Sequence, residues 1–347
     1  MRLVNHDIGL NFEPIIVAEM SGNHNQSLEN ALKIVDKAAD VGIKFLKIQT
    51  YTADTMTIDL NSDDFFISDK KSLWSGNSLY DLYNKAYTPW EWHKPIMDHA
   101  KKRGIICFST PFDESAVDFL ETLDVPLYKI ASFENNNPKL IKKVCKTKKP
   151  IIISTGLSTI TQISELVEVL KSENHSEYIL LKCTSSYPST PSDSNILTIP
   201  HMRELFNCEV GLSDHTMGIG APIAAVAHGA TLIEKHFTLD RSEGGVDSEF
   251  SLEPQEMKSL IIETKRAWQA LGKISYDVTK NEKNSLKFKR SIFITEDIRK
   301  NEIISSKNIR IIRPGNGLNP KYYDLLIGRK VKNSIKKGTP ASWDLFL

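Results

Sequence analysis

This 347-residue sequence has little of what marks a membrane or nucleic-acid-binding protein. No apolar run approaches the roughly 18 residues that a membrane span needs, and the first 14 residues lack the apolar core of a signal peptide. The formal net charge is only +1, so no strong field draws nucleic acid or an anionic membrane to the chain. We therefore expect a cytoplasmic protein that binds neither membrane nor nucleic acid.

Cysteine is also scarce, and no two cysteines form the Cys-x-x-Cys pair of a zinc site or redox motif. Three of the four lie in or beside apolar runs typical of buried strands. We interpret all four as reduced thiols of the protein core, the usual state in the cytosol. A redox or nucleophilic role is the alternative. They are Cys107, Cys145, Cys183 and Cys208.

The sequence does contain a regular alternation of short β-branched runs and longer amphipathic stretches. Among the amphipathic stretches, 27–42 has Ser27 as its N-cap and ends at Gly42, 159–172 is a second example, and 253–272 is the predicted closing helix. Eight strand–helix units predict an α/β protein with a closed (β/α)8 barrel, the TIM barrel. The predicted strands are 15–20, 45–50, 105–110, 127–132, 151–156, 179–184, 209–214 and 232–237.

Two segments depart from this repeat. Residues 51–88 are too long, polar and aromatic for an ordinary strand–helix loop, so we interpret them as an insertion at the substrate-binding end of the barrel. Its aromatic residues form either the packed interior of a lid or a sugar-facing surface. Beyond the barrel, predicted over 1–280, we expect a charged linker over 281–289 and a small β-rich domain over 290–347.

Lysines occupy one shared position in four predicted strands, FLKIQ, LYKIA, LLKCT and IEKHF. Because barrel interiors are built in layers from alternate strands, we expect Lys47, Lys129, Lys182 and Lys235 to share one inward-facing layer. Buried lysines are costly unless they are paired or bind an anion, so this layer favours a phosphate-containing substrate. A Schiff-base lysine is one alternative. Another is that some of them, Lys182 and Lys235 above all, point outward between the helices.

Two histidines, His215 and His236, close neighbouring predicted strands. Such a pair at the open face of a barrel can bind one divalent metal. Imidazole suits Mn, Zn or Fe, and further oxygen ligands from water and substrate favour Mn or Mg. The carboxylates near the strand ends, which can neutralise the lysines, are Glu19, Glu134 and Glu234, and the hydroxyls there are Thr50, Ser109, Thr110, Ser132, Thr155, Ser185, Tyr187 and Ser213.

Motifs along nearly the whole chain resemble those of the bacterial sialic acid synthases. They include AEMSGNHNQSLENA, KIQTY, STPFDESAVDFL, GLSDHTMG and EKHFTLDR. ASFE (131–134) replaces the S-G-E form usual in that family, and YTPWEWHKPI (87–96) is similar to its pseudaminic acid branch. RSI (290–292) and RPGNG (313–317) resemble the antifreeze-like (SAF) domain of the same family.

The resemblance implies a condensation of phosphoenolpyruvate with the open-chain aldehyde form of an N-acetylated amino sugar. The expected sugar is 2,4-diacetamido-2,4,6-trideoxy-L-altrose, and the products are pseudaminic acid and phosphate. A divalent cofactor, Mn or Mg, is implied, as is a domain-swapped homodimer in which the small domain of one subunit caps the barrel mouth of the other. N-acetylneuraminate or legionaminate synthesis is the near alternative. A Schiff-base aldolase and a non-catalytic sugar-binding protein are more distant ones.

Site residues implied by the resemblance fall into four groups. The metal ligands are His215 and His236, and the catalytic residues are Glu19, Lys129 and Glu134, with the carboxylates assigned to water activation and proton transfer. The phosphoenolpyruvate-binding positions are Lys47, Thr110, Lys129, Ser132 and Ser213. Two further substrate-binding positions come from the family's N-x-Y-P motif, in which Ser185 replaces the Asn that contacts phosphate and Tyr187 keeps the aromatic residue. The sugar-contacting positions are Gln49, Asn77, Asp247 and Arg313, the last acting from the partner subunit.

Overall fold

The computed structural model describes residues 1–60, 62–70 and 72–347. Contacts divide the chain into two compact units, Met1–Gly272 and Lys273–Leu347. The predicted linker over 281–289 overlaps a 3-10 helix, η5 (Glu282–Phe288), in the second unit. The two units are described separately.

The first unit is built on eight parallel strands that close into a barrel, in the order β10-β3-β4-β5-β6-β7-β8-β9. Parallel pairing of β10 with β3 closes the ring, with His236 opposite Glu19. The eight-strand prediction is therefore confirmed. The strands are β3 (Ile15–Glu19), β4 (Phe45–Thr50), β5 (Ile106–Pro111), β6 (Tyr128–Ile130), β7 (Ile151–Ser154), β8 (Tyr178–Cys183), β9 (Glu209–Asp214) and β10 (Leu232–His236).

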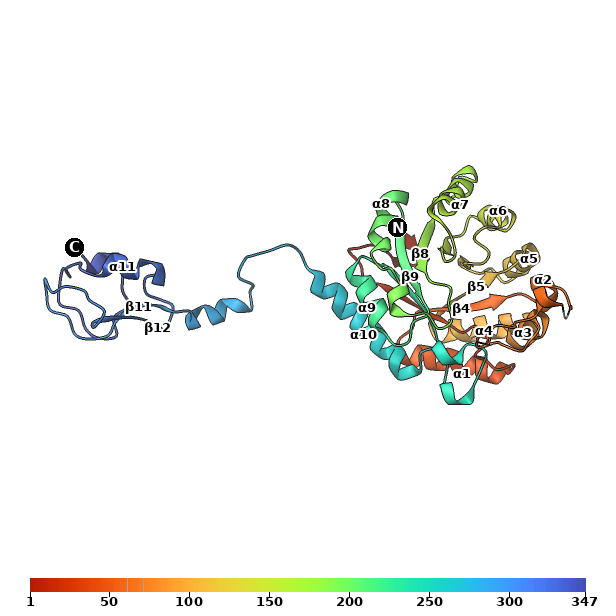
Figure 1. Cartoon of the computed structure of the whole chain (residues 1–347), viewed down its shortest axis with the longest axis horizontal. Helices are drawn as coiled ribbons and strands as arrows, with labels where there is room; N and C mark the ends of the chain where they lie inside the picture. The colour runs from red at the N-terminus through yellow and green to blue at the C-terminus, as the bar shows by residue number, and fades with distance from the viewer. Residues whose placement is uncertain (61, 71) are drawn as a thin grey trace. The chain divides into compact units, whose positions relative to one another are not determined.

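Helices form a ring around these strands (Figure 1). The first begins where predicted, because the Ser27 hydroxyl accepts a hydrogen bond from the Asn30 amide, and it ends at Gly42 with a left-handed φ of 98°. The helices between and after the strands are α1 (Leu28–Val41), α4 (Trp90–Lys102), α5 (Glu114–Thr122), α6 (Pro138–Lys146), α7 (Ile160–Ser172), α8 (Thr198–Phe206), α9 (Gly220–Ala227) and α10 (Pro254–Leu271).

Two apolar clusters separate the inward and outward faces of the strands. Outward residues such as Leu46 and Ile130 join the large cluster under the helices. Inward residues fill the interior of the barrel, where a short hairpin of β1 (Arg2–Leu3) and β2 (His6–Asp7) adds Leu3. This interior cluster also contains Ile8, Ile15, Val17, Phe45, Phe108, Leu127, Ile152, Ile179, Leu181 and Leu232.

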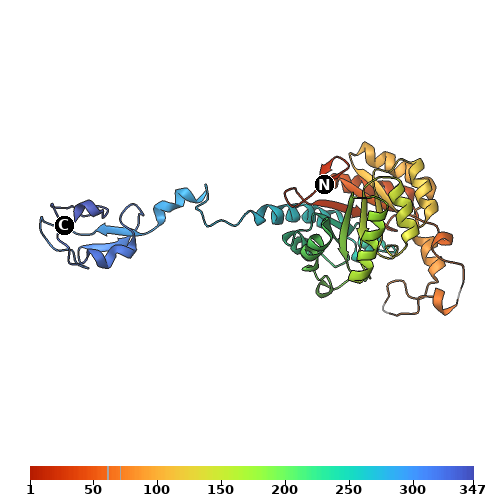
Figure 2. The same cartoon turned by 90° about the horizontal axis from the view of Figure 1, so that it is seen from above.

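The predicted insertion over 51–88 contains α2 (Ala53–Met56), the 3-10 helix η1 (Asp63–Phe65) and α3 (Leu79–Ala86). Two of its positions, 61 and 71, lie outside the described residues. Figure 2 shows this segment, in orange, projecting from the body of the barrel. Its aromatic residues play mixed parts: Tyr83 packs on Tyr51, whereas Trp74 contacts Tyr187 from the loop after β8.

The second unit is a small β-rich domain with its own core. Strands β11 (Ser291–Ile294) and β12 (Ile309–Ile312) pair in antiparallel fashion, and a short helix, α11 (Tyr323–Leu326), precedes the last turns. Its core contains Ile292, Ile294, Ile298, Ile304, Ile309, Leu326, Val331, Ile335, Ala341 and Phe346.

In the part of the chain that the structure describes, no helix has both the length and the hydropathy required to span a membrane.

Candidate active site

A layer of charged side chains lies above the apolar interior, at the carboxyl ends of the barrel strands. Lys47 Nζ lies 2.7 Å from Glu19 Oε2 and 3.7 Å from Glu234 Oε1. Lys129 Nζ lies 3.6 Å from the same Glu234 oxygen. All four side chains are buried. The barrel mouth thus holds two lysines whose charges are matched by two carboxylates.

The two lysines differ in protonation behaviour. Burial lowers the pKa of Lys47, but the carboxylates of Glu19 and Glu234 outweigh it and raise that pKa above its ordinary value. Burial lowers the pKa of Lys129, and only part of the effect is offset by Glu234. Lys47 is therefore the firmer positive charge, and an anion bound nearby would stabilise the charged form of both.

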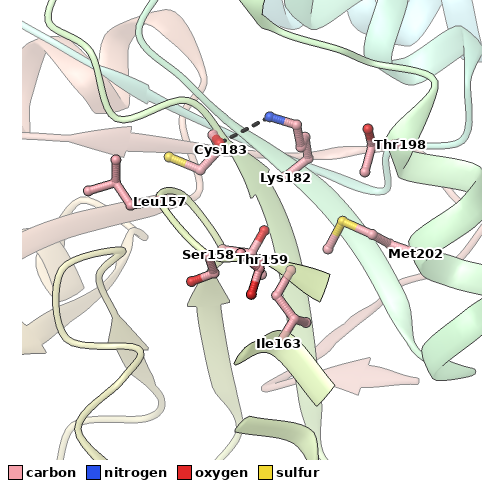
Figure 3. Close-up of a pocket in the computed structure, with 9 residues that line it drawn as sticks. Leu157, Ser158, Thr159, Ile163, Lys182, Cys183, Thr198 and Met202 are labelled. Atoms are coloured by element: carbon pink, nitrogen blue, oxygen red, sulfur yellow. Dashed lines mark hydrogen bonds between the residues drawn. The ribbon is translucent and has the colours of Figure 1, made fainter. Parts of the chain in front are cut away.

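The prediction that four lysines share this inward layer is wrong for Lys182 and Lys235. In β8 the inward residues are Ile179 and Leu181, so Lys182 points outward. Lys182 lines a cavity of about 330 Å³ that also involves α7 and α8. Its ammonium group folds back to the Cys183 carbonyl at 3.0 Å (Figure 3).

Lys235 also lies on the outer face, because its neighbour Glu234 is the inward residue of β10. It is fully buried and pairs with Asp214 at 2.5 Å. The residues that precede these lysines, 179–181 in β8 and 232–233 in β10, are apolar on both faces, so the sequence pattern does not reveal which face a following polar residue occupies. The alignment of the four strands by their apolar neighbours therefore placed Lys182 and Lys235 one residue out of register. Because side chains alternate along a strand, an error of one residue assigns a side chain to the opposite face.

The structure brings His215 and His236 together, with ring centroids 5.4 Å apart. His215 Nδ1 lies 3.0 Å from the Thr184 carbonyl oxygen, which orients the ring and leaves Nε2 for another partner. His236 Nδ1 is buried without a hydrogen bond from the described residues, and Asp247 Oδ2 lies 3.7 Å away. Burial and the neighbouring His215 lower the pKa of His236 well below its ordinary value, so this ring is neutral.

A divalent cation fits this pair of imidazoles, because His236 is neutral and a protonated His215 would release its proton when a metal binds. Within residues 1–60, 62–70 and 72–347, no group of three or more His, Cys, Asp or Glu side chains is arranged as a metal site. The remaining ligands would then come from water and substrate, an open coordination sphere typical of catalytic metals. His215 also contacts Cys183. Despite burial, this contact raises the pKa of His215 and lowers that of Cys183 to about 6.

Hydroxyl groups line the same layer. Thr110 Oγ1 accepts a hydrogen bond from Lys47 at 3.2 Å, and Ser213 donates to Glu234 at 3.0 Å. The Ser132 hydroxyl accepts from the Gly156 amide at 3.1 Å. A side chain at Gly156 would overlap both Ser132 and Ser185. These hydroxyls and the glycine amide form a compact polar surface beside Lys129.

Three of the hydroxyls expected at the mouth, those of Thr50, Ser109 and Thr155, point elsewhere. Thr50 and Ser109 occupy outward positions, where they hydrogen-bond each other at 2.6 Å. Thr50 also contacts the buried ring of His93 from α4 at 2.8 Å. These hydroxyls therefore hydrogen-bond to buried polar groups between the barrel and its helices, and not to a ligand at the mouth.

Ser154 is a mouth residue that the sequence interpretation missed. Lys129 Nζ donates to its hydroxyl at 2.7 Å, and both side chains are buried. The available signal was the period-2 alternation of β7, because Ile152 faces inward and Ser154 is two residues further along. The sequence interpretation chose the adjacent Thr155, whose hydroxyl donates to the Leu181 carbonyl instead.

Glu134 follows β6 and has a buried oxygen, Oε2, with no hydrogen-bond partner among the described residues. Burial raises its pKa to about 7, although the positive charge of Lys129 opposes the shift. A carboxyl group with this pKa can both donate and accept a proton near neutral pH.

Polar residues next to the Lys47–Glu19 pair form a second cluster. Gln49 Nε2 donates to Glu19 Oε1 at 2.9 Å and to the Ser21 hydroxyl at 3.1 Å. The Ser21 hydroxyl in turn donates to Asp247. Asp247 Oδ2, 3.7 Å from His236 Nδ1, connects this cluster to the histidines, and Tyr187 packs on His215 with 4.5 Å between the ring centroids.

The last two predicted sugar-contacting residues lie elsewhere. Asn77 sits in the insertion, where it donates to the Trp74 carbonyl at 3.0 Å and accepts from Lys85 at 2.8 Å. Arg313 lies in the second unit and is exposed. The surroundings of Asn77 and Arg313 do not by themselves indicate what either residue binds.

The site therefore combines cationic and hydroxyl groups suited to a phosphorylated carboxylate with an imidazole pair suited to a cation. A carboxyl group that titrates near neutrality lies beside them. Such an arrangement can hold an anion while a carbonyl group is polarised next to it.

Comparison with known proteins agrees with this geometry. Residues 34–276 match the NeuB family and residues 289–347 match the SAF domain. The pseudaminic acid synthase of Campylobacter jejuni is 44% identical over 323 residues, covering 93% of this chain and 94% of that protein. The pseudaminic acid synthase of Helicobacter pylori is 41% identical over 332 residues, covering 95% and 97%.

A crystal structure of N-acetylneuraminic acid synthetase from Leptospira borgpetersenii, in complex with citrate, superposes with a TM-score of 0.73 at 30% identity. The match covers 83% of this chain and 95% of that one. By sequence and by fold, the chain belongs to the NeuB family and carries a SAF domain at its carboxy-terminal end.

Proposed function

We propose that this chain is a pseudaminic acid synthase. It condenses phosphoenolpyruvate with 2,4-diacetamido-2,4,6-trideoxy-L-altrose and water to give pseudaminic acid and phosphate. A carbon–carbon bond forms between C3 of phosphoenolpyruvate and C1 of the open-chain sugar, and the C2–O bond to phosphate breaks. The observation that carries the proposal is the placement of Lys47 and Lys129 in the same barrel mouth as the imidazole pair.

In this proposal, phosphoenolpyruvate occupies the cationic side of the mouth. Lys47 and Lys129 hold its anionic groups, and charge-assisted hydrogen bonds from such groups are stronger than neutral ones. The hydroxyl surface near Gly156 supports this assignment, because the lack of a side chain at Gly156 lets the hydroxyls of Ser132 and Ser185 both lie close to its backbone. The remaining hydroxyls assigned to this substrate are Thr110 and Ser213.

The imidazoles of His215 and His236 would hold the cofactor, Mn or Mg. When bound, the cation supplies Lewis acidity toward the carbonyl oxygen of the sugar. Glu19 and Glu134 move protons and stabilise positive charge at C2 of the enol. The raised pKa of Glu134, about 7, which burial causes, supports a role in proton transfer near neutrality.

The sugar is proposed to contact Gln49, Tyr187 and Asp247, with Asn77 contributed by the insertion. Arg313 completes the site from a second copy of the chain in a domain-swapped homodimer. Exposed apolar side chains after three barrel strands support a cover over the mouth. They are Phe133, Leu157 and Met217, which are 56%, 69% and 54% exposed.

A cytoplasmic location is part of the proposal, since none of the four cysteines forms a disulfide. N-acetylneuraminate synthesis remains the competing activity, because the Leptospira enzyme shares this fold at 30% identity. The higher identity to the Campylobacter enzyme, 44%, favours the deoxy sugar.

The deciding assay supplies phosphoenolpyruvate, Mn²⁺ and one amino sugar at a time, and measures phosphate release. Preference for the 2,4-diacetamido-2,4,6-trideoxy-L-altrose precursor is expected over N-acetylmannosamine and the legionaminic acid precursor. Borohydride with substrate should trap no covalent adduct, whereas EDTA should stop turnover and Mn²⁺ should restore it. Trapping of a lysine adduct would instead indicate a Schiff-base aldolase.

A further inference from the structure

The loop that follows β3 holds Ser21 in a backbone conformation that side chains rarely adopt. Its φ is +47°, in the left-handed region that favours glycine. Asn25 and Gln26 in the same loop also have positive φ, but they are exposed, whereas Ser21 is 4% exposed. Asparagine tolerates the left-handed region because its side chain can hydrogen-bond to the nearby backbone, whereas serine has no such local preference for it. Buried residues held in this way cluster at functional sites.

The Ser21 hydroxyl has a complete set of partners. It donates its hydrogen to Asp247 Oδ2, a residue 226 positions away in the chain. It accepts a hydrogen bond from Gln49 Nε2 at 3.1 Å. A single hydroxyl, in the loop after β3, thus joins the end of β4 to the loop after β10, the strands on either side of β3.

These contacts decide which atoms of the two partners remain for a ligand. Gln49 uses its NH₂ group on Ser21 and Glu19. Asp247 uses Oδ2 on Ser21. Among the described residues, none donates a hydrogen bond to Gln49 Oε1 or to Asp247 Oδ1. Both remaining atoms are acceptors, so the pair presents two acceptors to the mouth.

We propose that Ser21 is a positioning residue for the sugar substrate, holding Gln49 and Asp247 so that both present acceptors to hydroxyl or acetamido N–H groups. The inference rests on the proposed function. Phosphoenolpyruvate has no hydrogen-bond donor when fully ionised, so it cannot donate a hydrogen bond to Gln49 Oε1 or Asp247 Oδ1. The effect of Ser21 should therefore fall on one substrate and not on the other.

Two substitutions test this inference in the full-length chain with Mn²⁺. Ser21→Ala removes the hydroxyl, and Ser21→Gly removes it while accepting a φ of +47° without strain, so the loop keeps its conformation. Both should raise the KM for the sugar about tenfold and change the KM for phosphoenolpyruvate less than twofold. Asn25→Gly, at an exposed position of positive φ in the same loop, should change neither value.

A binding measurement makes the test independent of turnover. The probe is the borohydride-reduced sugar, an open-chain alditol that cannot react, titrated calorimetrically in the presence of Mn²⁺. Its Kd should rise about tenfold in Ser21→Gly and stay unchanged in Asn25→Gly. If the wild-type protein binds phosphoenolpyruvate but no amino-sugar alditol, the proposed function itself fails and the inference fails with it.

A double-mutant cycle separates positioning from general loosening of the loop. In an Asp247→Ala background, Ser21→Ala should weaken alditol binding by less than a further twofold, because the interaction is already lost. A merely structural serine would give effects that multiply. The inference is overturned by multiplying effects, by an equal rise in KM for both substrates, or by a sugar KM within twofold of wild type in both Ser21 variants.

Discussion

Lys235 Nζ lies 2.5 Å from Asp214 Oδ2 on the outer face of the barrel, and each residue directly precedes one of the two mouth histidines. The residues stand opposite each other in the β9–β10 ladder, and neither side chain is exposed by more than 2%. Lys235 also contacts the Thr216 carbonyl. This buried ion pair ties together the strand ends that carry His215 and His236.

Lys235→Met should lower the free energy of unfolding by roughly 3–5 kcal/mol, because it leaves the Asp214 carboxylate buried without its counter-ion. Urea unfolding followed by circular dichroism measures this. The control is Lys94→Met, which breaks an exposed pair with Asp98 at 2.9 Å and should cost about 1 kcal/mol or less. Equal costs for the two variants would contradict a structural role for the buried pair.

Removal of either mouth imidazole should abolish Mn²⁺-dependent turnover. His215→Ala and His236→Ala each delete one of the two proposed protein ligands, so the cation should no longer bind at working concentrations. Phosphate release across a Mn²⁺ titration is the measurement, with thermal unfolding to verify the fold. His228→Ala, at an exposed position after α9, is the control. Full activity in either mouth variant would refute the metal site.

The rate should titrate with an apparent pKa near 7 that belongs to Glu134. Burial raises the pKa of this carboxyl to about 7, so its charge changes in the range where the enzyme is assayed. Glu134→Gln should remove that inflection from the pH profile of kcat/KM and slow turnover by about 10²-fold or more. Glu29→Gln, at an exposed position on α1, should keep the wild-type profile. An unchanged inflection in Glu134→Gln would assign it to another group.

The barrel should lose stability as pH falls below about 6.5. Burial lowers the pKa of His93 from its ordinary value of about 6.5 to about 4. Between pH 6.5 and pH 4, the unfolded chain therefore binds a proton at this histidine that the folded chain does not bind. The stability contribution is therefore complete above pH 6.5 and declines toward pH 4, by about 2 kcal/mol at pH 5. His24 should add to the effect, since burial also lowers its pKa to about 4.

Denaturant unfolding at pH 7 and pH 5 tests this for His93→Gln, which should lose less stability between the two pH values than the wild type. His201→Gln, at an exposed position on α8, should behave as the wild type does. The same pH dependence in all three proteins would rule out His93 as a source.

Arg313→Ala should raise the KM for the sugar about tenfold with little change for phosphoenolpyruvate, because a guanidinium provides several hydrogen bonds to a polar ligand. Arg310→Ala, an exposed neighbour on β12, is the control. If Arg313 acts on a second copy, mixing Arg313→Ala with inactive His236→Ala should restore part of the activity, since one site of each mixed dimer is then intact. No recovery would contradict the domain-swapped arrangement.

Much of the fold could be predicted from the chain. Eight short β-branched runs separated by amphipathic stretches correspond to the eight barrel strands, and local signals such as Ser27 and Gly42 mark helix ends. These features depend on neighbours in sequence, so their physical causes can be read along the chain. The small second domain was expected for the same reason, since the periodicity changes after about residue 280.

Facing direction and long-range contacts were decided only by tertiary structure. Lys47 and Lys182 look equivalent among apolar neighbours, yet one faces the barrel interior and the other the helices, because strands buried on both faces lack polar alternation. The Ser21–Asp247 contact depends on a left-handed backbone and on closure of the barrel across 226 residues. The sequence determined the elements and the residue types at the strand ends. Their closure into a ring decided which of those side chains meet, because only closure brings the first strand beside the last.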